Sequence, residues 1–196
     1  MKAEEVVQEF KDKGALLEGH FQLSSGLHST VYLQCARVLQ YPDIAERFGQ
    51  AIARNFEGQE IQLVASPAIG GLIIGHEVAR ALGARFVWTE REKGVMTLRR
   101  GFSVSDGERT LVVEDVITTG GSTRETIEVL KAAGANVVGA ASIIDRSKGD
   151  ADVGVPRITL ASLKVTSVEA ANCDACRQGE PITKPGSKTQ SVVSGN

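Results

Sequence analysis

Apolar and polar positions alternate with two different periods along this chain. Apolar residues between Val6 and Leu17 follow the spacing of an amphipathic helix that is interrupted near Gly14. His20–Gln34 differs, because two short apolar pieces flank the polar centre Ser24–Thr30. This pattern predicts two extended segments joined by a loop.

Beyond residue 42, short apolar runs alternate with longer amphipathic segments. The runs expected to form strands are Ile61–Ala65, Arg85–Thr89, Thr110–Glu114, Val137–Ile144 and Ile158–Leu163. The expected helices are Pro42–Asn55, Leu72–Leu82 and Thr123–Ala133. Glu90–Glu108 is polar and charged, so a long loop or a loosely paired hairpin is expected there. Strands that alternate with helices predict an α/β fold with a mostly parallel central sheet flanked by helices.

Composition narrows the classes of function. The chain has 196 residues, of which 42% are hydrophobic and 23% charged, as in a soluble globular domain. A formal net charge of −2 gives no basic field for nucleic acid, so no nucleic-acid partner is expected. No apolar run approaches the roughly 20 residues that span a membrane, so no membrane partner is expected. Three cysteines make a poor disulfide framework, and the expected location is cytoplasmic.

The densest chemistry lies in Leu111–Thr123, which reads Leu-Val-Val-Glu-Asp-Val-Ile-Thr-Thr-Gly-Gly-Ser-Thr. An apolar strand leads into Glu114 and Asp115, whose carboxylates can accept hydrogen bonds from vicinal hydroxyls or face a cation. Thr118–Thr123 can surround an anion with backbone N–H groups and hydroxyls at the positive end of a helix. The alternative is a strand–turn–helix joint whose hydroxyls cap the helix.

This segment resembles the phosphoribosyl-pyrophosphate signature of the type I phosphoribosyltransferases, with Glu-Asp where many members have Asp-Asp. The resemblance implies a type I phosphoribosyltransferase fold with a small N-terminal hood. It also implies that phosphoribosyl pyrophosphate contacts Glu114, Asp115, Val116, Ile117, Thr118, Thr119, Gly120, Gly121 and Ser122.

A second loop, Ala65–Gly71, carries two glycines between a predicted strand and a predicted helix. By itself it is a tight turn before a helix. Family members have a pyrophosphate loop here, so the resemblance implies contacts from Ala68, Ile69 and Gly70, and a non-proline cis peptide near Ala68-Ile69.

The segment Glu90–Phe102 has more basic than acidic residues. Such a run is commonly a solvated surface. Family members have a flexible catalytic loop at this place, frequently offered to the neighbouring subunit. The resemblance therefore implies that Arg91 and Lys93 act with Asp115 in catalysis and contact phosphoribosyl pyrophosphate. This chain has no histidine in the segment, which leaves open which cation acts.

Phe21–Ser29 resembles the amino-terminal segment of orotate phosphoribosyltransferases, although the usual Lys and Arg are absent. The resemblance implies orotate contacts from Ser25, His28, Thr118 and Arg146, and a surface histidine is the alternative for His28. Arg146 follows the fourth predicted strand and could form paired hydrogen bonds to a carboxylate.

The resemblance implies an enzyme that joins orotate to phosphoribosyl pyrophosphate, giving orotidine 5′-phosphate and pyrophosphate in pyrimidine (UMP) biosynthesis. It implies Mg²⁺ held mainly by substrate and water, with no direct protein ligand, and a homodimer that shares the basic loop. Two alternatives remain open: a phosphoribosyltransferase for a purine or another base, and a non-catalytic regulator that binds phosphoribosyl pyrophosphate.

The expected organisation is a single domain over residues 1–196. Its hood covers about residues 1–40 with C-terminal additions, its core covers about 41–165, and the tail Gly179–Asn196 is expected to be flexible. Cys173 and Cys176 form a Cys-x-x-Cys pair, and a tetrahedral zinc site needs two further ligands. The candidates Cys35, His20, His28 and His76 are expected to lie in unrelated elements. A structural turn with reduced thiols, a redox pair and a metal site between subunits all remain open.

Overall fold

The computed structural model describes residues 1–23, 26–163, 165 and 167–184. The chain divides into two compact units. The first contains Met1–Ala15 and Gln34–Lys164, and the second contains Leu16–Leu33 and Val165–Asn196. The amino-terminal hairpin is thus grouped with the C-terminal segment, whereas the first residues of the chain are grouped with the larger unit.

Six strands form the sheet of the first unit, in the order β5-β4-β3-β6-β7-β8. They are β3 (Leu63–Pro67), β4 (Arg85–Glu92), β5 (Val95–Leu98), β6 (Arg109–Ile117), β7 (Asn136–Asp145) and β8 (Arg157–Ser162). Only the β4–β5 pair is antiparallel among these neighbours. The predicted α/β fold with a mostly parallel sheet is confirmed, and part of the charged segment forms the β4–β5 hairpin.

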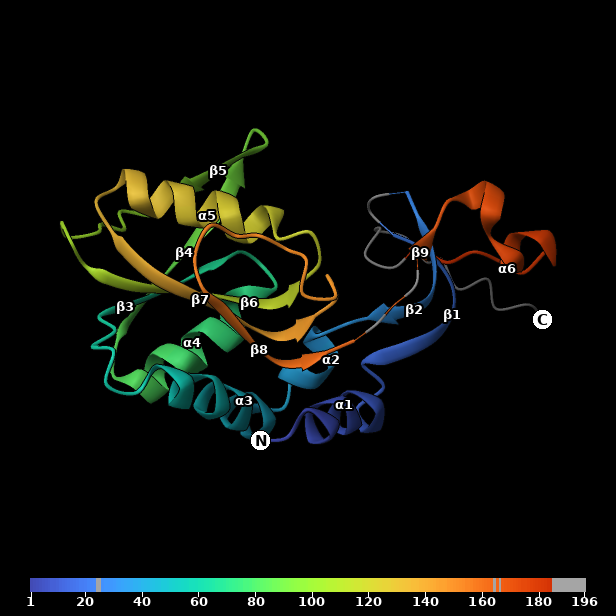
Figure 1. The fold of residues 1–196 in the computed structure, drawn as a ribbon, viewed down its shortest axis with the longest axis horizontal. Helices are drawn as coiled ribbons and strands as arrows, with labels where there is room; N and C mark the ends of the chain where they lie inside the picture. The colour runs from blue at the N-terminus through green and yellow to red at the C-terminus, as the bar shows by residue number, and fades with distance from the viewer. Residues whose placement is uncertain (24–25, 164, 166, 185–196) are drawn as a thin grey trace, which may run out of the picture. The chain divides into compact units, whose positions relative to one another are not determined.

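Helices cover both faces of this sheet (Figure 1). Helices α3 (Pro42–Ala53) and α4 (Gly71–Leu82) lie on one face, and α5 (Gly121–Ala132) lies on the other. The unit also contains α1 (Ala3–Asp12), the short α2 (Ala36–Leu39) and the 3-10 turn Arg54–Phe56. Because both faces are covered, Leu111, Val112 and Val113 of β6 are fully buried, as is typical of a central parallel strand.

The carboxyl ends of the parallel strands bring the predicted functional loops to one edge of the sheet. Strand β6 extends to Ile117, beyond the predicted end at Glu114. The extension follows from Val116 and Ile117, which continue the pairing with Ile144 and Asp145 of β7. The acidic pair is therefore held inside the end of a strand and does not lie in a loose turn.

The second unit contains a three-stranded antiparallel sheet in the order β1-β2-β9. Its elements are β1 (Leu16–Gln22), β2 (His28–Leu33), β9 (Ser167–Val168), the 3-10 turn Ala170–Asn172 and α6 (Asp174–Arg177). The predicted pair of extended segments is confirmed as the β1–β2 hairpin. None of the helices in the described ranges has the length and apolar character needed to cross a membrane.

Candidate functional site

The acidic pair at the end of β6 is the centre of the candidate site. Glu114 is 8% exposed, and the N–H of Val116 donates to Asp115 Oδ1 at 2.9 Å. Burial raises the pKa of both carboxyls, and the charge of Asp115 raises the pKa of Glu114 further. The two side chains also hydrogen-bond each other. The pair therefore favours retaining a proton until a hydrogen-bond donor or a cation approaches.

The predicted phosphate loop encloses a small cavity directly after the acidic pair. The cavity has a volume of about 60 Å³ and is lined by Glu114, Val116, Ile117, Thr118, Thr119, Gly120, Gly121, Ser122 and Thr123. Since one water needs roughly 10–15 Å³ of such volume, the cavity has room for a small oxyanion. Helix α5 begins at Gly121, so its free N–H groups face an anion in this loop.

Gly120 permits the turn into α5. Its φ of 76° lies in the left-handed region, and a β-carbon there would lie 2.8 Å from Val153 Cγ1. A side chain at this position would therefore distort the loop both through its backbone and through contact with Val153.

The second glycine-rich loop lies against the acidic pair. The Ala68-Ile69 peptide is cis, as the resemblance implied. The Ala68 N–H donates to the carbonyl of Thr89 at 2.7 Å, which ties the loop to β4. A β-carbon on Gly70 would lie 2.7 Å from Asp115 Oδ1. Absence of a side chain at Gly70 therefore lets this loop contact the Asp115 carboxylate directly, while Ile69 is 84% exposed at its tip.

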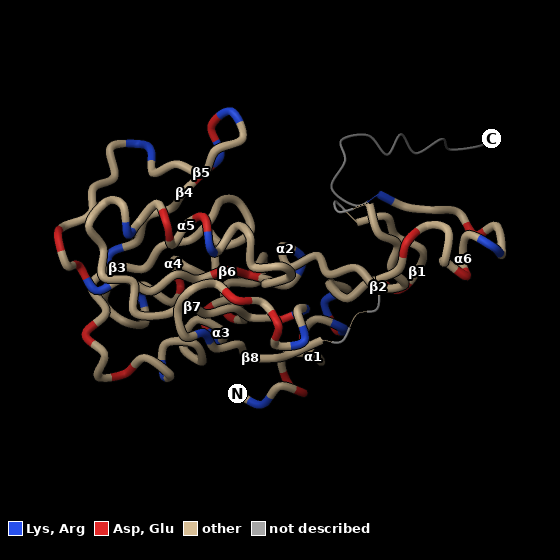
Figure 2. Tube along the Cα trace, turned by 45° about the horizontal axis from the view of Figure 1, so that its top comes forward, with Lys and Arg blue, Asp and Glu red and all other residues tan. Residues whose placement is uncertain are grey.

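Ion pairs with glutamates neutralise most of the basic charge of the β4–β5 hairpin. Figure 2 shows acidic and basic segments close together along it. Its ion pairs are Arg99 to Glu92 at 3.2 Å, Arg100 to Glu90 at 2.8 Å and Arg91 to Glu125 of α5 at 2.6 Å. Among the four basic residues of Glu90–Phe102, all of which the structure describes, Lys93 is the one with no ion pair within 4.0 Å. Lys93 lies in the exposed turn of the hairpin.

The end of β7 separates the roles of two arginines. Arg157 pairs with Asp145 at 3.1 Å, and both side chains are largely buried. Burial opposes ionisation of Asp145, but hydrogen bonds from Ser147 and the charge of Arg157 lower its pKa overall. Arg157 therefore braces this strand end. The Arg146 N–H donates to the carbonyl of Ile117, which fixes Arg146 beside the phosphate loop.

Cys35, at the start of α2, is a neighbour of the acidic pair that sequence reasoning missed. Its thiol hydrogen-bonds the Asp115 carboxylate. Burial raises the pKa of this thiol, the charges of Asp115 and Glu114 raise it further, and the charge of Arg146 lowers it. Arg146 thus acts electrostatically on the same small region. No local motif around Cys35 in the sequence indicated this contact.

The predicted orotate residues fall into separate parts of the molecule. Thr118 and Arg146 lie in the first unit, at adjacent strand ends. Ser25 lies outside the described residues. His28 is 5% exposed in the second unit, and its Nδ1 lies 3.2 Å from Cys176 Sγ. The predicted contacts of Ser25 and His28 with a base stay predictions.

Comparison with known proteins places this geometry in a family. The family model for the phosphoribosyl transferase domain matches residues 36–159. The chain is 52% identical to orotate phosphoribosyltransferases of Caldicellulosiruptor bescii and Pelotomaculum thermopropionicum, over 96% of this chain and 99% of each relative. The crystal structure of orotate phosphoribosyltransferase from Aeropyrum pernix is similar, with 30% identity, a TM-score of 0.65 and coverage of 81% of this chain and 94% of that one.

The matched region contains the acidic pair, both glycine-rich loops, the basic hairpin and Arg146. The identity to the two curated relatives extends through nearly the whole length of each chain. On this agreement of local geometry, domain match and full-length identity, the chain belongs to the orotate phosphoribosyltransferase family, within the phosphoribosyl transferase domain proteins.

Proposed function

We propose that this chain transfers the ribose 5-phosphate group of phosphoribosyl pyrophosphate to orotate, giving orotidine 5′-phosphate and pyrophosphate for UMP synthesis. The observation that carries the proposal is the direct contact of two anion-binding loops with one acidic pair. Gly70 of the first loop lies against Asp115, and the cavity of the second loop begins at Glu114. A ribose with a phosphate at one end and a pyrophosphate at the other has this arrangement of groups.

In the proposed reaction, the bond between the anomeric carbon and the pyrophosphate oxygen breaks, and its electron pair leaves with pyrophosphate. A ring nitrogen of orotate forms the new bond to that carbon, and the proton of that nitrogen passes to the departing pyrophosphate or to water. The chain contributes position and charge. The Thr118–Ser122 loop holds the 5′-phosphate, and Glu114 and Asp115 accept from the ribose hydroxyls. Ile69 and Gly70 donate backbone N–H groups to the pyrophosphate, since the Ala68 N–H already donates to Thr89.

The donor atoms at this edge fit Mg²⁺. The carboxylates of Glu114 and Asp115 place hard oxygen atoms at this edge, while the ion itself would be held mainly by substrate oxygens and water, with no direct protein ligand. When bound, Mg²⁺ supplies positive charge that neutralises the pyrophosphate oxygens. Burial raises the pKa values of Glu114 and Asp115, and positive charge nearby would favour their ionised forms.

For base selection we assign the orotate carboxylate to Arg146 and a second polar contact to Thr118. A guanidinium offers paired donors that match a carboxylate in geometry. The support is placement: Arg146 follows β7, its N–H is bonded to Ile117, and Ile117 directly precedes Thr118.

The proposal includes a homodimer in which the β4–β5 hairpin serves the partner's site. Support comes from the hairpin's exposure, since Val95 at its turn is 67% exposed and Lys93 has no ion pair among the described residues. A mixture of a Lys93→Ala chain with an Asp115→Asn chain tests this. Activity of the mixture above that of either variant alone supports a hairpin shared between subunits. Activity no higher than that of the separate variants contradicts it.

The activity itself is tested with purified chain, phosphoribosyl pyrophosphate, Mg²⁺ and a panel of orotate, uracil, adenine and hypoxanthine. Pyrophosphate release and the nucleotide product are measured for each base. Product with orotate alone supports the proposal. Preference for a purine, or binding of phosphoribosyl pyrophosphate without turnover on any base, contradicts it and favours the corresponding alternative.

A further inference from the structure

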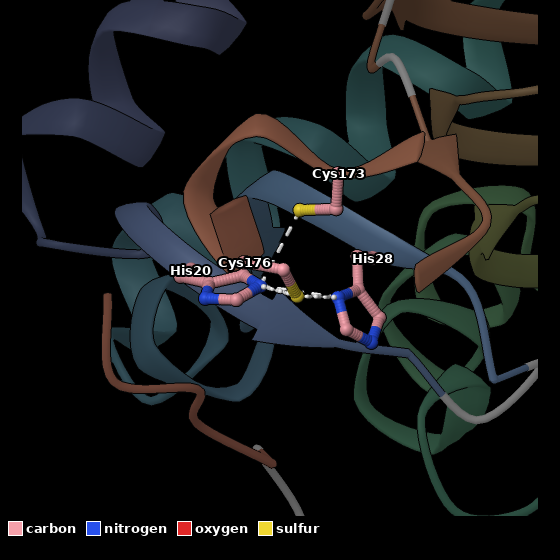
Figure 3. A group of neighbouring side chains, drawn as sticks. All are labelled: His20, His28, Cys173 and Cys176. Atoms are coloured by element: carbon pink, nitrogen blue, oxygen red, sulfur yellow. Dashed lines mark hydrogen bonds between the residues drawn. The ribbon is translucent and has the colours of Figure 1, made fainter. Parts of the chain in front are cut away.

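Four side chains with metal-binding atoms converge inside the second unit (Figure 3). His20 comes from β1, His28 from β2, and Cys173 and Cys176 from the segment at α6. The four atoms that could bind a metal all lie within 4.8 Å of one another. We call these four residues the His/Cys cluster. The roles proposed above for the residues of the first unit do not use it, although His28 is also the residue expected to contact orotate.

The strand pairing explains why the two histidines meet. His28 pairs opposite Gln22, and His20 precedes Gln22 by two residues. His20 lies in a register irregularity between Glu18 and Phe21, and its Nε2 is 3.1 Å from His28 Nδ1. The interpretation of His20 and His28 as members of unrelated elements is therefore wrong, because the hairpin places them together beside the Cys-x-x-Cys turn. His76 does lie in a separate element, α4 of the first unit.

The distances within the His/Cys cluster match those of a tetrahedral site. His20 Nε2 lies 3.1 Å from His28 Nδ1 and 3.5 Å from the Sγ atoms of both Cys173 and Cys176. His28 Nδ1 lies 3.2 Å from Cys176 Sγ. Zinc bonds of about 2.0–2.1 Å to nitrogen and about 2.3 Å to sulfur require tetrahedral edges of roughly 3.3–3.8 Å, and the four distances above lie within about 0.4 Å of the corresponding edges. The four atoms are thus spaced to share one ion.

The outer hydrogen bond of His20 sets the orientation that a metal ligand needs. His20 Nδ1 lies 3.0 Å from the carbonyl oxygen of Glu180. Because a carbonyl oxygen can only accept, Nδ1 carries the proton, and Nε2 of the neutral ring presents its lone pair to the His/Cys cluster. A backbone carbonyl that accepts from the second ring nitrogen is the usual support of a metal-bound histidine. Backbone bonds between His20 and Thr183 and between Gln22 and Thr183 hold this carbonyl segment beside β1.

The second unit has little apolar core to hold it together. Among its described residues, the buried apolar side chains are Phe21, Leu33, Ala175 and Cys173 itself. His20 and His28 are each 5% exposed, so two polar imidazole rings fill interior space that apolar side chains fill in most domains. Small units with such cores commonly depend on disulfides or metals. A cavity of about 170 Å³, lined in part by His20, His28 and Cys173, lies directly beside the cluster.

We propose that His20, His28, Cys173 and Cys176 bind a structural Zn²⁺ ion that joins the β1–β2 hairpin to the C-terminal segment. Two imidazole nitrogens and two thiolates form a common structural zinc set, and the Cys-x-x-Cys spacing is usual for it. Four protein ligands leave no open position for a substrate, which assigns the ion to structure. The His/Cys cluster binds it independently of the transferase reaction.

Metal content of the full-length chain is the first test. The chain is expressed in medium with zinc, purified without chelator, and analysed by elemental mass spectrometry. One tightly held zinc per chain supports the proposal. Replacement by Co²⁺ should give the intense visible bands of a tetrahedral site together with a thiolate-to-cobalt charge-transfer band. Absence of bound metal, or a six-coordinate cobalt spectrum, overturns it.

Variants then locate the ion. Cys173→Ser and His20→Ala should each weaken zinc affinity by more than about 100-fold, the upper end of the effect of changing outer partners alone. The matched controls are Cys35→Ser and His76→Ala, which change a cysteine and a histidine of the first unit and should keep one zinc per chain. Zinc retained in the cluster variants, or lost equally in the controls, overturns the assignment.

Chelation of the wild-type chain makes the test independent of variant folding. Removal of zinc should lower the melting temperature and make residues 16–33 and 167–184 exchange amide hydrogens faster, and added Zn²⁺ should reverse both changes. Unchanged exchange after complete removal overturns the structural role. Mass spectrometry that finds a stable Cys173–Cys176 disulfide in freshly purified protein overturns it as well, because oxidised sulfurs cannot provide two thiolates.

Discussion

The backbone of Gly70 approaches the side chain of Asp115 so closely that a β-carbon on Gly70 would lie 2.7 Å from one carboxylate oxygen and 2.8 Å from the other. This contact joins the pyrophosphate loop to the acid proposed to hold the ribose. Glycine is needed here for close approach, since the φ of Gly70 is −57° and any residue can adopt it.

Gly70→Ala is expected to displace the Asp115 carboxylate and to lower kcat/KM by about 100-fold, because a shift on the order of 1 Å in a positioning group can cost that much. Steady-state kinetics and calorimetric titration with phosphoribosyl pyrophosphate measure the effect. Gly49→Ala is the matched control, since its β-carbon would lie 2.7 Å from Glu77 Cβ between α3 and α4. It should lower stability while folded molecules bind normally. Equal binding by both variants would contradict the proposed contact.

Glu114→Gln is expected to stabilise the ligand-free chain at neutral pH and to reduce activity. Folding raises the pKa of Glu114 above 4.5 through burial, so the folded state holds the proton more tightly than the unfolded state. Wild-type stability must then fall as pH rises from about 4.5 through the folded pKa. Each kcal/mol by which the variant increases the free energy of unfolding should raise its Tm by about 2–4 °C. Loss of a charged hydrogen bond to the ribose should cost about 10- to 150-fold in kcat/KM.

Glu108→Gln provides the control of opposite sign. Arg85 hydrogen-bonds Glu108 at 2.7 Å and lowers its pKa, so the carboxylate contributes stability above the unfolded pKa and loses it as pH falls. This variant should melt lower than wild type at pH 7, and the difference should shrink in acid. Melting curves of both variants across pH 4–8 decide the matter, and a Glu114→Gln variant that melts lower than wild type at pH 8 would refute the burial argument.

Lys93→Ala should reduce kcat more than it weakens ground-state binding of phosphoribosyl pyrophosphate. The residue lies in an exposed turn and has no ion pair within the part of the chain that the structure describes, so we expect its charge to stabilise the negative charge that grows on the departing pyrophosphate. Loss of one charged contact predicts about a 10- to 150-fold decrease in kcat with little change in Tm. Arg99→Ala, which removes a cation already paired with Glu92, is the control and should retain most of the activity. A Lys93→Ala effect confined to KM would mean a binding role.

Arg146→Ala should weaken orotate binding by about 10- to 150-fold and leave phosphoribosyl pyrophosphate binding nearly unchanged, because only orotate carries the carboxylate. Calorimetry with orotate and uracil measures the preference. Arg157→Ala separates this role from bracing, since it breaks the buried pair with Asp145 and should cost about 3–5 kcal/mol of stability. A stable Arg146→Ala variant with unchanged orotate affinity would reopen the choice of base.

The sequence supported the sheet and the acidic site well because their signals are local. Apolar runs such as Leu111–Val113 predict buried strands, and the Thr-Gly-Gly-Ser stretch lies only a few residues after the acids in the sequence. The end of β6 was misplaced because strand pairing with β7, which no local pattern encodes, carries it on to Ile117.

Contacts between distant segments were beyond reach of the same reasoning. The Cys35 thiol meets Asp115 across the fold, and the arginines of the charged segment find acids whose positions depend on the hairpin register and on α5. The His/Cys cluster joins residues whose sequence separation reaches 156. Spacing rules detect one half of such a site, the Cys-x-x-Cys, and miss the half that the β1–β2 pairing supplies.

The long sequence separation within the His/Cys cluster also determines when the second unit can finish folding during synthesis. The β1–β2 hairpin leaves the ribosome early, but its partners Cys173 and Cys176 emerge much later, 148 residues after His28 in the case of Cys176. At about 5–20 residues per second, the hairpin waits roughly 7–30 s with both imidazoles lacking their thiol neighbours. Nascent chains that terminate between Ser162 and Ser167 contain every strand of the larger sheet, yet their first hairpin lacks both its third strand β9 and the two thiols.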